Sequence, residues 1–231
     1  MNIKKYIILL CLLIFSITNA NNAFALNSDY GDYEMNTGFE VKEYDNPDLD
    51  AFSSKVKLGL LVFDYDGKIE NFDVNENGDI VVAYETVSIE KKVCVYNSLG
   101  EFQYGYSLLD FGTIGVEWDG ENVIIYSVRG AYLVLLDKYA NILDKKIVLN
   151  TTANNTYRNK TLWKTEKMVG SDKYRLKNSK IIKTTPDQKE FVIIDKSQNH
   201  YFSLLFFVSF FVFLIIGVTI VMICFFRNYG R

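Results

Sequence analysis

Histidine and cysteine are scarce in this sequence, and their scarcity limits the chemistry available to it. Of 231 residues, one is histidine and three are cysteine. The histidine, His200, directly precedes a long apolar run. A histidine-based triad and a histidine-ligated metal site are therefore nearly excluded, and no serine or cysteine lies in a recognisable nucleophile motif with a base nearby. We expect no catalytic residue and no bound cofactor.

The three cysteines lie in three different regions of the chain. Cys11 belongs to an N-terminal apolar run and Cys224 to a C-terminal one, which leaves Cys94 alone between them. No disulfide can form within that middle region. A composition rich in Lys, Asn, Ile and Tyr and without disulfides is typical of an exported protein of a Gram-positive bacterium.

An excess of positive charge is also missing. Lys and Arg number 25 against 28 Asp and Glu, a net charge of -3, so nothing indicates the basic face of a nucleic-acid-binding protein. One local imbalance stands out, because eight carboxylates between Asp29 and Asp50 accompany a single Lys42. Residues 26–55 are thus predicted to be a flexible acidic leader, with a short strand possible near Val41 and cation binding as the alternative.

The C-terminal apolar run has the length of a membrane span. Residues 201–226 contain no charged residue, and about 20 apolar residues suffice to cross about 30 Å of hydrocarbon. Arg227 and Arg231 follow, which places that end on the cytoplasmic side. We expect a transmembrane helix at 201–226 and a cytoplasmic tail at 227–231. The alternative, a buried helix of a soluble protein, requires a far larger surrounding domain.

The N-terminal apolar run has the features of a secretory signal. Lys4 and Lys5 precede an apolar stretch at 6–17, and Ala23-Phe24-Ala25 has the small-x-small spacing of a cleavage site. Residues 1–25 are predicted to be a signal peptide. Cleavage after Ala20 and an uncleaved anchor are alternatives, and each leaves the middle of the chain outside. The predicted location is the cell membrane, single-pass, with the N-terminus outside and the C-terminus cytoplasmic.

One pattern recurs between residues 56 and 196. Three segments, 61–69, 93–102 and 133–142, share one order of residue types. Each has an apolar run, an Asp or Asn, a short turn, a Gly or Ala, a polar residue and an apolar residue. The turn glycines Gly78 and Gly120, each before an apolar run, lie 42 positions apart (120 minus 78). A period of about 40 residues with four strands per unit is typical of a propeller blade.

The remaining strands are predicted from turn residues and alternation. Tyr65-Asp66-Gly67 is expected to join two strands in a hairpin. Residues 164–196 contain four short strand candidates, and the polar stretch 150–161 is predicted to be an exposed loop. Residues 56–196 thus form an all-β domain of about three antiparallel, four-stranded, blade-like meanders in this interpretation.

These motifs support a resemblance. In each repeat a turn leads into an apolar strand, GDIVVAYE (78–85) or GENVIIY (120–126), and the hairpin that follows ends with VYNSLGEF or LDKYANI. Over about 57–196 this pattern resembles the repeats of NHL-type and related six-bladed β-propellers. Propellers use about 4 to 8 blades, so the resemblance implies a partial or small propeller whose ring is open, very small or completed by other copies. The signal, repeats and single C-terminal span also look similar to small single-pass membrane proteins of Gram-positive bacteria, which implies no activity.

One turn matches the first half of a calcium loop, with oxygen-bearing side chains at alternating positions before a glycine. Its candidate ligands are Asp73, Asn75, Asn77 and Asp79. The bidentate Glu of such loops is absent, because Tyr84 occupies the twelfth position. We favour the interpretation that these residues cap a β-turn, and keep calcium as the alternative.

Two further hypotheses remain for the β domain. Asp64 and Asp66 form a carboxylate pair of the kind used in glycoside hydrolysis, although turn chemistry already explains both. Aromatic side chains are frequent on the repeats, and core packing is favoured for them over an exposed patch for a partner or glycan. The aromatic residues concerned are Phe102, Tyr104, Tyr106, Phe111, Trp118 and Tyr126.

The sequence therefore favours a noncatalytic function. We expect a membrane-anchored, extracytoplasmic interaction module that binds the lipid bilayer through its C-terminal helix and a protein partner at the cell surface. Because residues 197–200 form a very short linker, the domain should sit against the outer leaflet. The alternative is a structural subunit of a membrane complex whose open sheet is completed by another copy or a partner.

Overall fold

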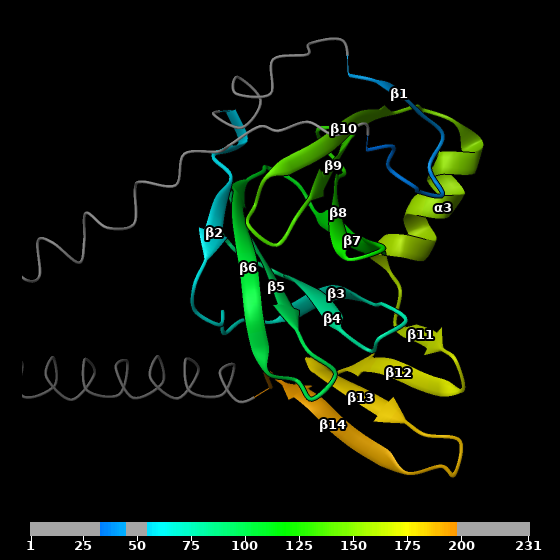
Figure 1. Cartoon of the computed structure of the whole chain (residues 1–231). Helices are drawn as coiled ribbons and strands as arrows, with labels where there is room; N and C mark the ends of the chain where they lie inside the picture. The colour runs from blue at the N-terminus through cyan, green and yellow to red at the C-terminus, as the bar shows by residue number, and fades with distance from the viewer. Residues whose placement is uncertain (1–32, 45–54, 198–231) are drawn as a thin grey trace, which may run out of the picture. The chain divides into compact units, whose positions relative to one another are not determined.

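Antiparallel β-sheet dominates the part of the chain that the computed structural model describes, residues 33–44 and 55–197 (Figure 1). The predicted signal peptide, membrane span and cytoplasmic tail lie outside these residues. Within 33–44 and 55–197, no helix is long and apolar enough to cross a membrane. The all-β, antiparallel class expected from the sequence is confirmed.

Three sheets account for the strands of this region. Sheet I has the spatial order β2 (Gly59–Leu61), β6 (Phe102–Leu109), β5 (Glu90–Tyr96), β4 (Ile80–Tyr84), β3 (Ile69–Val74). Sheet II has the order β1 (Val41–Glu43), β10 (Ile142–Val148), β9 (Tyr132–Leu136), β8 (Asn122–Ser127), β7 (Ile114–Asp119). Sheet III has the order β11 (Glu166–Val169), β12 (Asp172–Lys177), β13 (Lys180–Thr184), β14 (Glu190–Asp195). Each contains a meander of four consecutive strands, and helix α3 (Thr152–Leu162) connects sheet II to sheet III.

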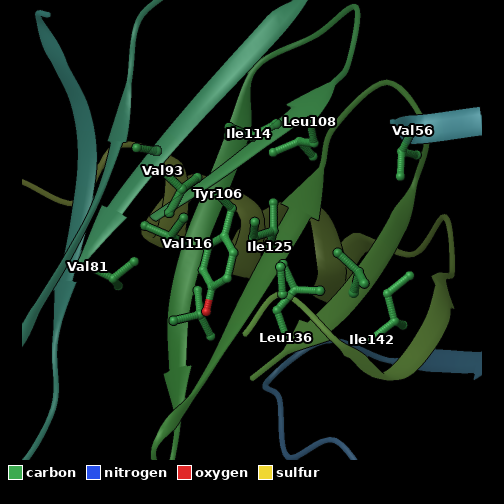
Figure 2. Close-up of a cluster of buried hydrophobic side chains, with 14 of the residues drawn as sticks. Val56, Val81, Val93, Tyr106, Leu108, Ile114, Val116, Ile125, Leu136 and Ile142 are labelled. Atoms are coloured by element: carbon green, nitrogen blue, oxygen red, sulfur yellow. The ribbon is translucent and has the colours of Figure 1, made fainter. Parts of the chain in front are cut away.

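Sheet I packs against sheet II through the largest apolar core. Val81 and Tyr106 of sheet I meet Val116 and Ile125 of sheet II, and all four side chains are almost fully buried (Figure 2). Burying a side chain of this size contributes about 1.5 to 3 kcal/mol. The first strands of the two meanders, β3 and β7, lie side by side at this junction.

The opposite face of sheet I packs against sheet III. Phe72, Tyr84 and Tyr96 of sheet I form a second core with Tyr174 and Ile181 of sheet III. Sheet I is therefore buried on both faces, and the residues of β4 are all buried. This double burial explains why β4 is a continuous apolar run without polar alternation.

Helix α3 and residues 33–44 cover the other face of sheet II. Leu162 of the helix and Phe39 of the N-terminal segment pack with Ile124 and Leu133 in a third core. Thr151 caps the helix, because its side chain accepts a hydrogen bond from the backbone N–H of Asn154.

Residues 33–44 differ from the flexible leader that their acidic composition predicts. Met35 and Phe39 are buried, and β1 pairs with β10 in the register Val41 to Val148. The ring of Phe39 lies 4.7 Å from that of Tyr126, centroid to centroid. Burial of these apolar side chains offsets the repulsion among the carboxylates, and the short strand expected near Val41 is confirmed.

The prediction of an exposed loop at 150–161 is wrong, because α3 occupies most of it. Asn154 is fully buried in the helix and holds the N-terminal segment in place. Its Oδ1 accepts a hydrogen bond from the Glu40 backbone N–H at 2.7 Å, and its Nδ2 donates to the carbonyl oxygens of Glu40 and Leu149. A polar residue serves here as a core residue, so hydrophobic periodicity could not reveal the helix.

The hairpin expected at Tyr65-Asp66-Gly67 is also wrong. Strand β2 pairs with β6, in the register Leu60 to Tyr106, and not with the following strand β3. The other turns are confirmed, including those at Gly78, Gly100 and Gly120, where the backbone has a positive φ angle. The four strands expected in 164–196 are β11 to β14.

Candidate functional site

The three turns that end the first strand of each meander converge at one cleft, which we call the axial cleft. It consists of two adjoining cavities of about 620 and 400 Å3. The turns are β3–β4, β7–β8 and β11–β12, and α3 with residues 36–38 completes the second cavity. The two cavities share Asp73, Trp118 and Lys167 as walls. Asp73 of sheet I, Trp118 of sheet II and Lys167 of sheet III thus line the same part of the axial cleft.

Asp73 is the central charged residue of the axial cleft. Its Oδ1 lies 2.7 Å from the Lys164 Nζ and 3.0 Å from the Lys167 Nζ, and its Oδ2 accepts a hydrogen bond from the Trp118 backbone N–H. The carboxylate is 5% exposed, whereas the lysine side chains are 17% and 35% exposed. A buried carboxylate requires such partners, and each lysine keeps further donors for a ligand.

Glu117 is the second buried carboxyl group of the cleft. Its Oε1 accepts hydrogen bonds from the hydroxyl groups of Tyr157 and Thr161, each at 2.9 Å. Burial raises the pKa of Glu117, and the two hydroxyl donors and the charge of Lys164 only partly oppose this shift. Helix α3 is therefore attached to β7 through hydrogen bonds to a carboxyl group whose ionisation is opposed by burial.

Trp118 forms the apolar wall between the two cavities. Its ring is half-buried and packs against the core of sheets I and II. Its indole Nε1 is buried and has no hydrogen-bond acceptor among the described residues. The amino groups of Lys160 and Lys167 and the carboxylates of Glu76 and Glu121 line the same two cavities. The lining therefore offers donors, acceptors and one large aromatic surface.

Three of the four candidate calcium ligands, Asp73, Asn75 and Asp79, use their side chains in other contacts. Asp73 bonds to two ammonium groups, as described above. The Asn75 Oδ1 accepts hydrogen bonds from the backbone N–H groups of Asn77 and Asp79, and its Nδ2 donates to the Asp79 carboxylate. This is the capping geometry of an Asx turn, so the alternating oxygens are explained by the turn and by the ion pairs of Asp73.

The candidate catalytic pair Asp64 and Asp66 lies away from the axial cleft. Asp64 accepts hydrogen bonds from the Tyr96 hydroxyl at 2.5 Å and from the Lys196 Nζ at 2.7 Å. The Tyr96 hydroxyl in turn contacts that of Tyr84, also at 2.5 Å, and burial raises the pKa of both phenols. Asp64 thus links sheet I to the end of sheet III.

The predicted aromatic residues are divided among several sites. Tyr106 and Tyr126 are core residues, whereas Phe111 is 69% exposed. Phe102 packs in the core of sheets I and III while Tyr104 packs in that of sheets I and II, because a register shift separates them on β6. The expectation that Phe102, Tyr104 and Tyr106 share one face is therefore wrong for Phe102. Trp118 alone of this group lines the axial cleft.

Sequence reasoning missed Glu117, Lys164 and Lys167 as cleft residues. Lys164 lies 91 positions from Asp73, and Thr161 lies 44 positions from Glu117. No short motif joins them, and Lys residues in a polar stretch are ordinarily solvated. The convergence of three turns, visible only in three dimensions, places them together.

The axial cleft offers charged and hydroxyl groups around the Trp118 ring. Asp73 is neutralised by two lysines, and among residues 33–44 and 55–197 no serine, cysteine or histidine lines either cavity. A mixture of polar groups around one aromatic wall is typical of a binding site. Comparison of the chain with protein-family models and with curated proteins finds no match.

Proposed function

We propose that this protein is a noncatalytic, membrane-anchored, extracytoplasmic interaction module, whose axial cleft receives part of a protein partner at the cell surface. The observation that carries the proposal is the convergence of one turn from each sheet on Trp118 and the ion pairs of Asp73. Rigid sheets hold these turns in fixed positions, which lowers the entropic cost of binding.

The β domain is interpreted as propeller-like. Each sheet contains a four-stranded meander, and β3 contacts both β7 and β11, the first strands of the other two meanders. Helix α3 contacts β7 and β3 and lies between sheets II and III in the chain. This interpretation makes the axial cleft the counterpart of the central opening at which propellers commonly present their turns.

The mixed charge of the cleft favours a protein partner over nucleic acid. Lys160, Lys164 and Lys167 are opposed by Asp73 and Glu117, and the rim adds two further carboxylates. A polyanion would meet acidic groups along with the lysines, whereas a polar peptide segment with an apolar side chain fits donors, acceptors and the Trp118 ring.

Site-specific photocrosslinking in the native host tests the proposal. A photoreactive residue at Met168, which lines the cleft and is 58% exposed, should give one discrete protein adduct. The same residue at Lys189, an exposed turn position outside the cleft, is the matched control and should give none. Glu121→Lys, a charge reversal at the rim, should remove the adduct from position 168. Equal adducts at both positions would contradict the proposal.

A second candidate, a subunit completed by another copy, is favoured by the outer face of sheet III. Val192 is more than half exposed there. However, the same face carries the ion pairs Lys173–Glu166 and Arg175–Glu190, which suit a solvated surface. Light scattering of the detergent-solubilised chain separates the two candidates, because the second requires at least a dimer.

A further inference from the structure

An exposed apolar pair follows the edge strand β2. Val62 is 60% exposed and Phe63 is 81% exposed, although both side chains are apolar. Both residues lie beyond the end of β2, and the backbone bends at Phe63, so this segment leaves the sheet with both side chains exposed. Single exposed apolar residues are common, but two consecutive ones at a projection indicate a contact surface.

The end of sheet III is fixed beside this pair. The Lys196 Nζ lies 2.7 Å from the Asp64 Oδ2, and the Lys196 backbone N–H donates to the Ser179 carbonyl oxygen at 2.9 Å. The Lys196 side chain is only 12% exposed, and its Nζ lies 5.8 Å from the centre of the Tyr96 ring. Asp64 directly follows Phe63, so the ion pair between Lys196 and Asp64 holds the end of β14 next to Val62 and Phe63.

The chain has little length left before its predicted membrane span. Four residues, 197–200, separate Lys196 from the apolar run that begins at residue 201. At about 3.3 to 3.6 Å per residue, five peptide steps cover at most about 18 Å. The interfacial layer of a bilayer is itself roughly 5 to 8 Å thick on each side of the hydrocarbon. Lys196, and with it Phe63, is thus held within reach of that layer.

We propose that Val62 and Phe63 lie in the outer interfacial layer of the same membrane that holds residues 201–226, as a second contact between domain and lipid. This inference rests on the membrane anchoring proposed above. The partner is the bilayer surface, because an aromatic ring at the headgroup level is favourable and Val62 adds apolar area. Asp64 does not oppose the contact, since Lys196 neutralises it.

The contact would orient the domain on the membrane. Figure 1 shows β2 and the end of β14 on the same side of the β domain, whereas α3 lies on the opposite side. Helix α3 supplies Tyr157, Lys160 and Thr161 to the axial cleft. A domain resting on the Phe63 side therefore presents these cleft residues away from the lipid, where a partner can reach them.

Fluorescence quenching by brominated lipid tests this inference on the full chain in vesicles. The native chain has two tryptophans, the half-buried Trp118 and the 67% exposed Trp163, which follows α3. The test protein carries Phe63→Trp and Trp163→Phe, and the native chain is the matched control with its exposed indole at 163. Bromine quenches on contact, and an indole at position 63 would lie at the headgroup level, so brominated vesicles should reduce its emission more than that of Trp163.

The outcomes separate this inference from the anchoring on which it rests. If alkaline carbonate leaves the chain in the vesicles but both proteins are quenched equally, the contact at Phe63 is disproved and the anchor stands. If carbonate releases the chain, the anchor fails and the contact fails with it. Selective quenching of the Phe63→Trp protein, abolished by Val62→Ser in the same chain, supports the contact.

Discussion

Glu117 shows how one buried residue couples the structure to pH. Its carboxyl group is surrounded by the helix side chains Tyr157 and Thr161, and burial raises its pKa above the ordinary value near 4.5. In the folded state the group therefore keeps its proton to a higher pH than in the unfolded state. Its favourable contribution is complete below the ordinary pKa and is lost as pH rises through the raised pKa.

Replacing Glu117 by Gln should make this pH dependence visible. The amide oxygen can still accept from the two hydroxyl groups, but it does not ionise. We expect the thermal midpoint of Glu117→Gln, relative to the native chain, to rise between pH 4.5 and pH 7.5. Glu70, whose pKa burial also raises, is present in both proteins and cancels in the comparison. A difference that stays flat over this range would contradict the assigned environment of Glu117.

At the scale of the element, one turn design is used four times. In the β3–β4, β5–β6, β9–β10 and β13–β14 turns, the first residue donates its N–H to the carbonyl oxygen four positions later and accepts from the N–H three positions later. Those first residues are Asn75, Asn97, Asp137 and Thr185. The fourth residue of each turn has a positive φ: Gly78, Gly100, Ala140 and Gln188. A positive φ favours glycine, so two of the four turns carry backbone strain.

Gln188→Gly should relieve that strain in the β13–β14 turn. Gln188 is exposed and has φ 64°, so glycine removes an unfavourable conformation without removing a packed side chain. The gain is expected to be about 0.5 to 1 kcal/mol, since glycine's added freedom in the unfolded state offsets part of it. Urea unfolding of the detergent-solubilised chain measures it.

The opposite change, Gly100→Ala, is the matched control for this prediction. Gly100 has φ 81°, and a Cβ there would lie 2.1 Å from the Ile193 carbonyl oxygen, so alanine should cost at least about 2 kcal/mol. If both substitutions had the same sign, the positive φ angles would not be the determinant.

The repeated turn is also the reason that much of the fold could be predicted. Asn or Asp at the first position, with Gly or Ala at the fourth, marks three hairpins in the sequence, and the apolar runs between them give the strands. The pairing of β2 with β6, helix α3 and the axial cleft could not be predicted in this way. Each depends on contacts between residues far apart in the sequence, such as Asn154 with Glu40 or Lys164 with Asp73. Local sequence patterns do not predict such contacts.

At the scale of the molecule, the two interfaces of sheet I are unequal. The core between sheets I and II contains many fully buried residues from both sheets. Sheet III contributes only Tyr174, Ile181 and Ile194 as buried residues to its core with sheet I. Its other face is exposed and carries ion pairs that contribute little to stability. Sheet III should therefore open at a lower free energy than the other two sheets.

Hydrogen exchange of matched core variants tests this order. Ile181 and Ile125 are both 0% exposed, and replacing either by Ala should cost about 2 to 4 kcal/mol at its own interface. Ile181→Ala should speed amide exchange within 166–195 and leave sheets I and II protected, whereas Ile125→Ala should speed exchange in both of those sheets. Selective opening would also separate Lys196 from Asp64 and from the Tyr96 ring of sheet I. Uniform exchange across all three sheets in the Ile181 variant would mean that the described region unfolds as one cooperative unit.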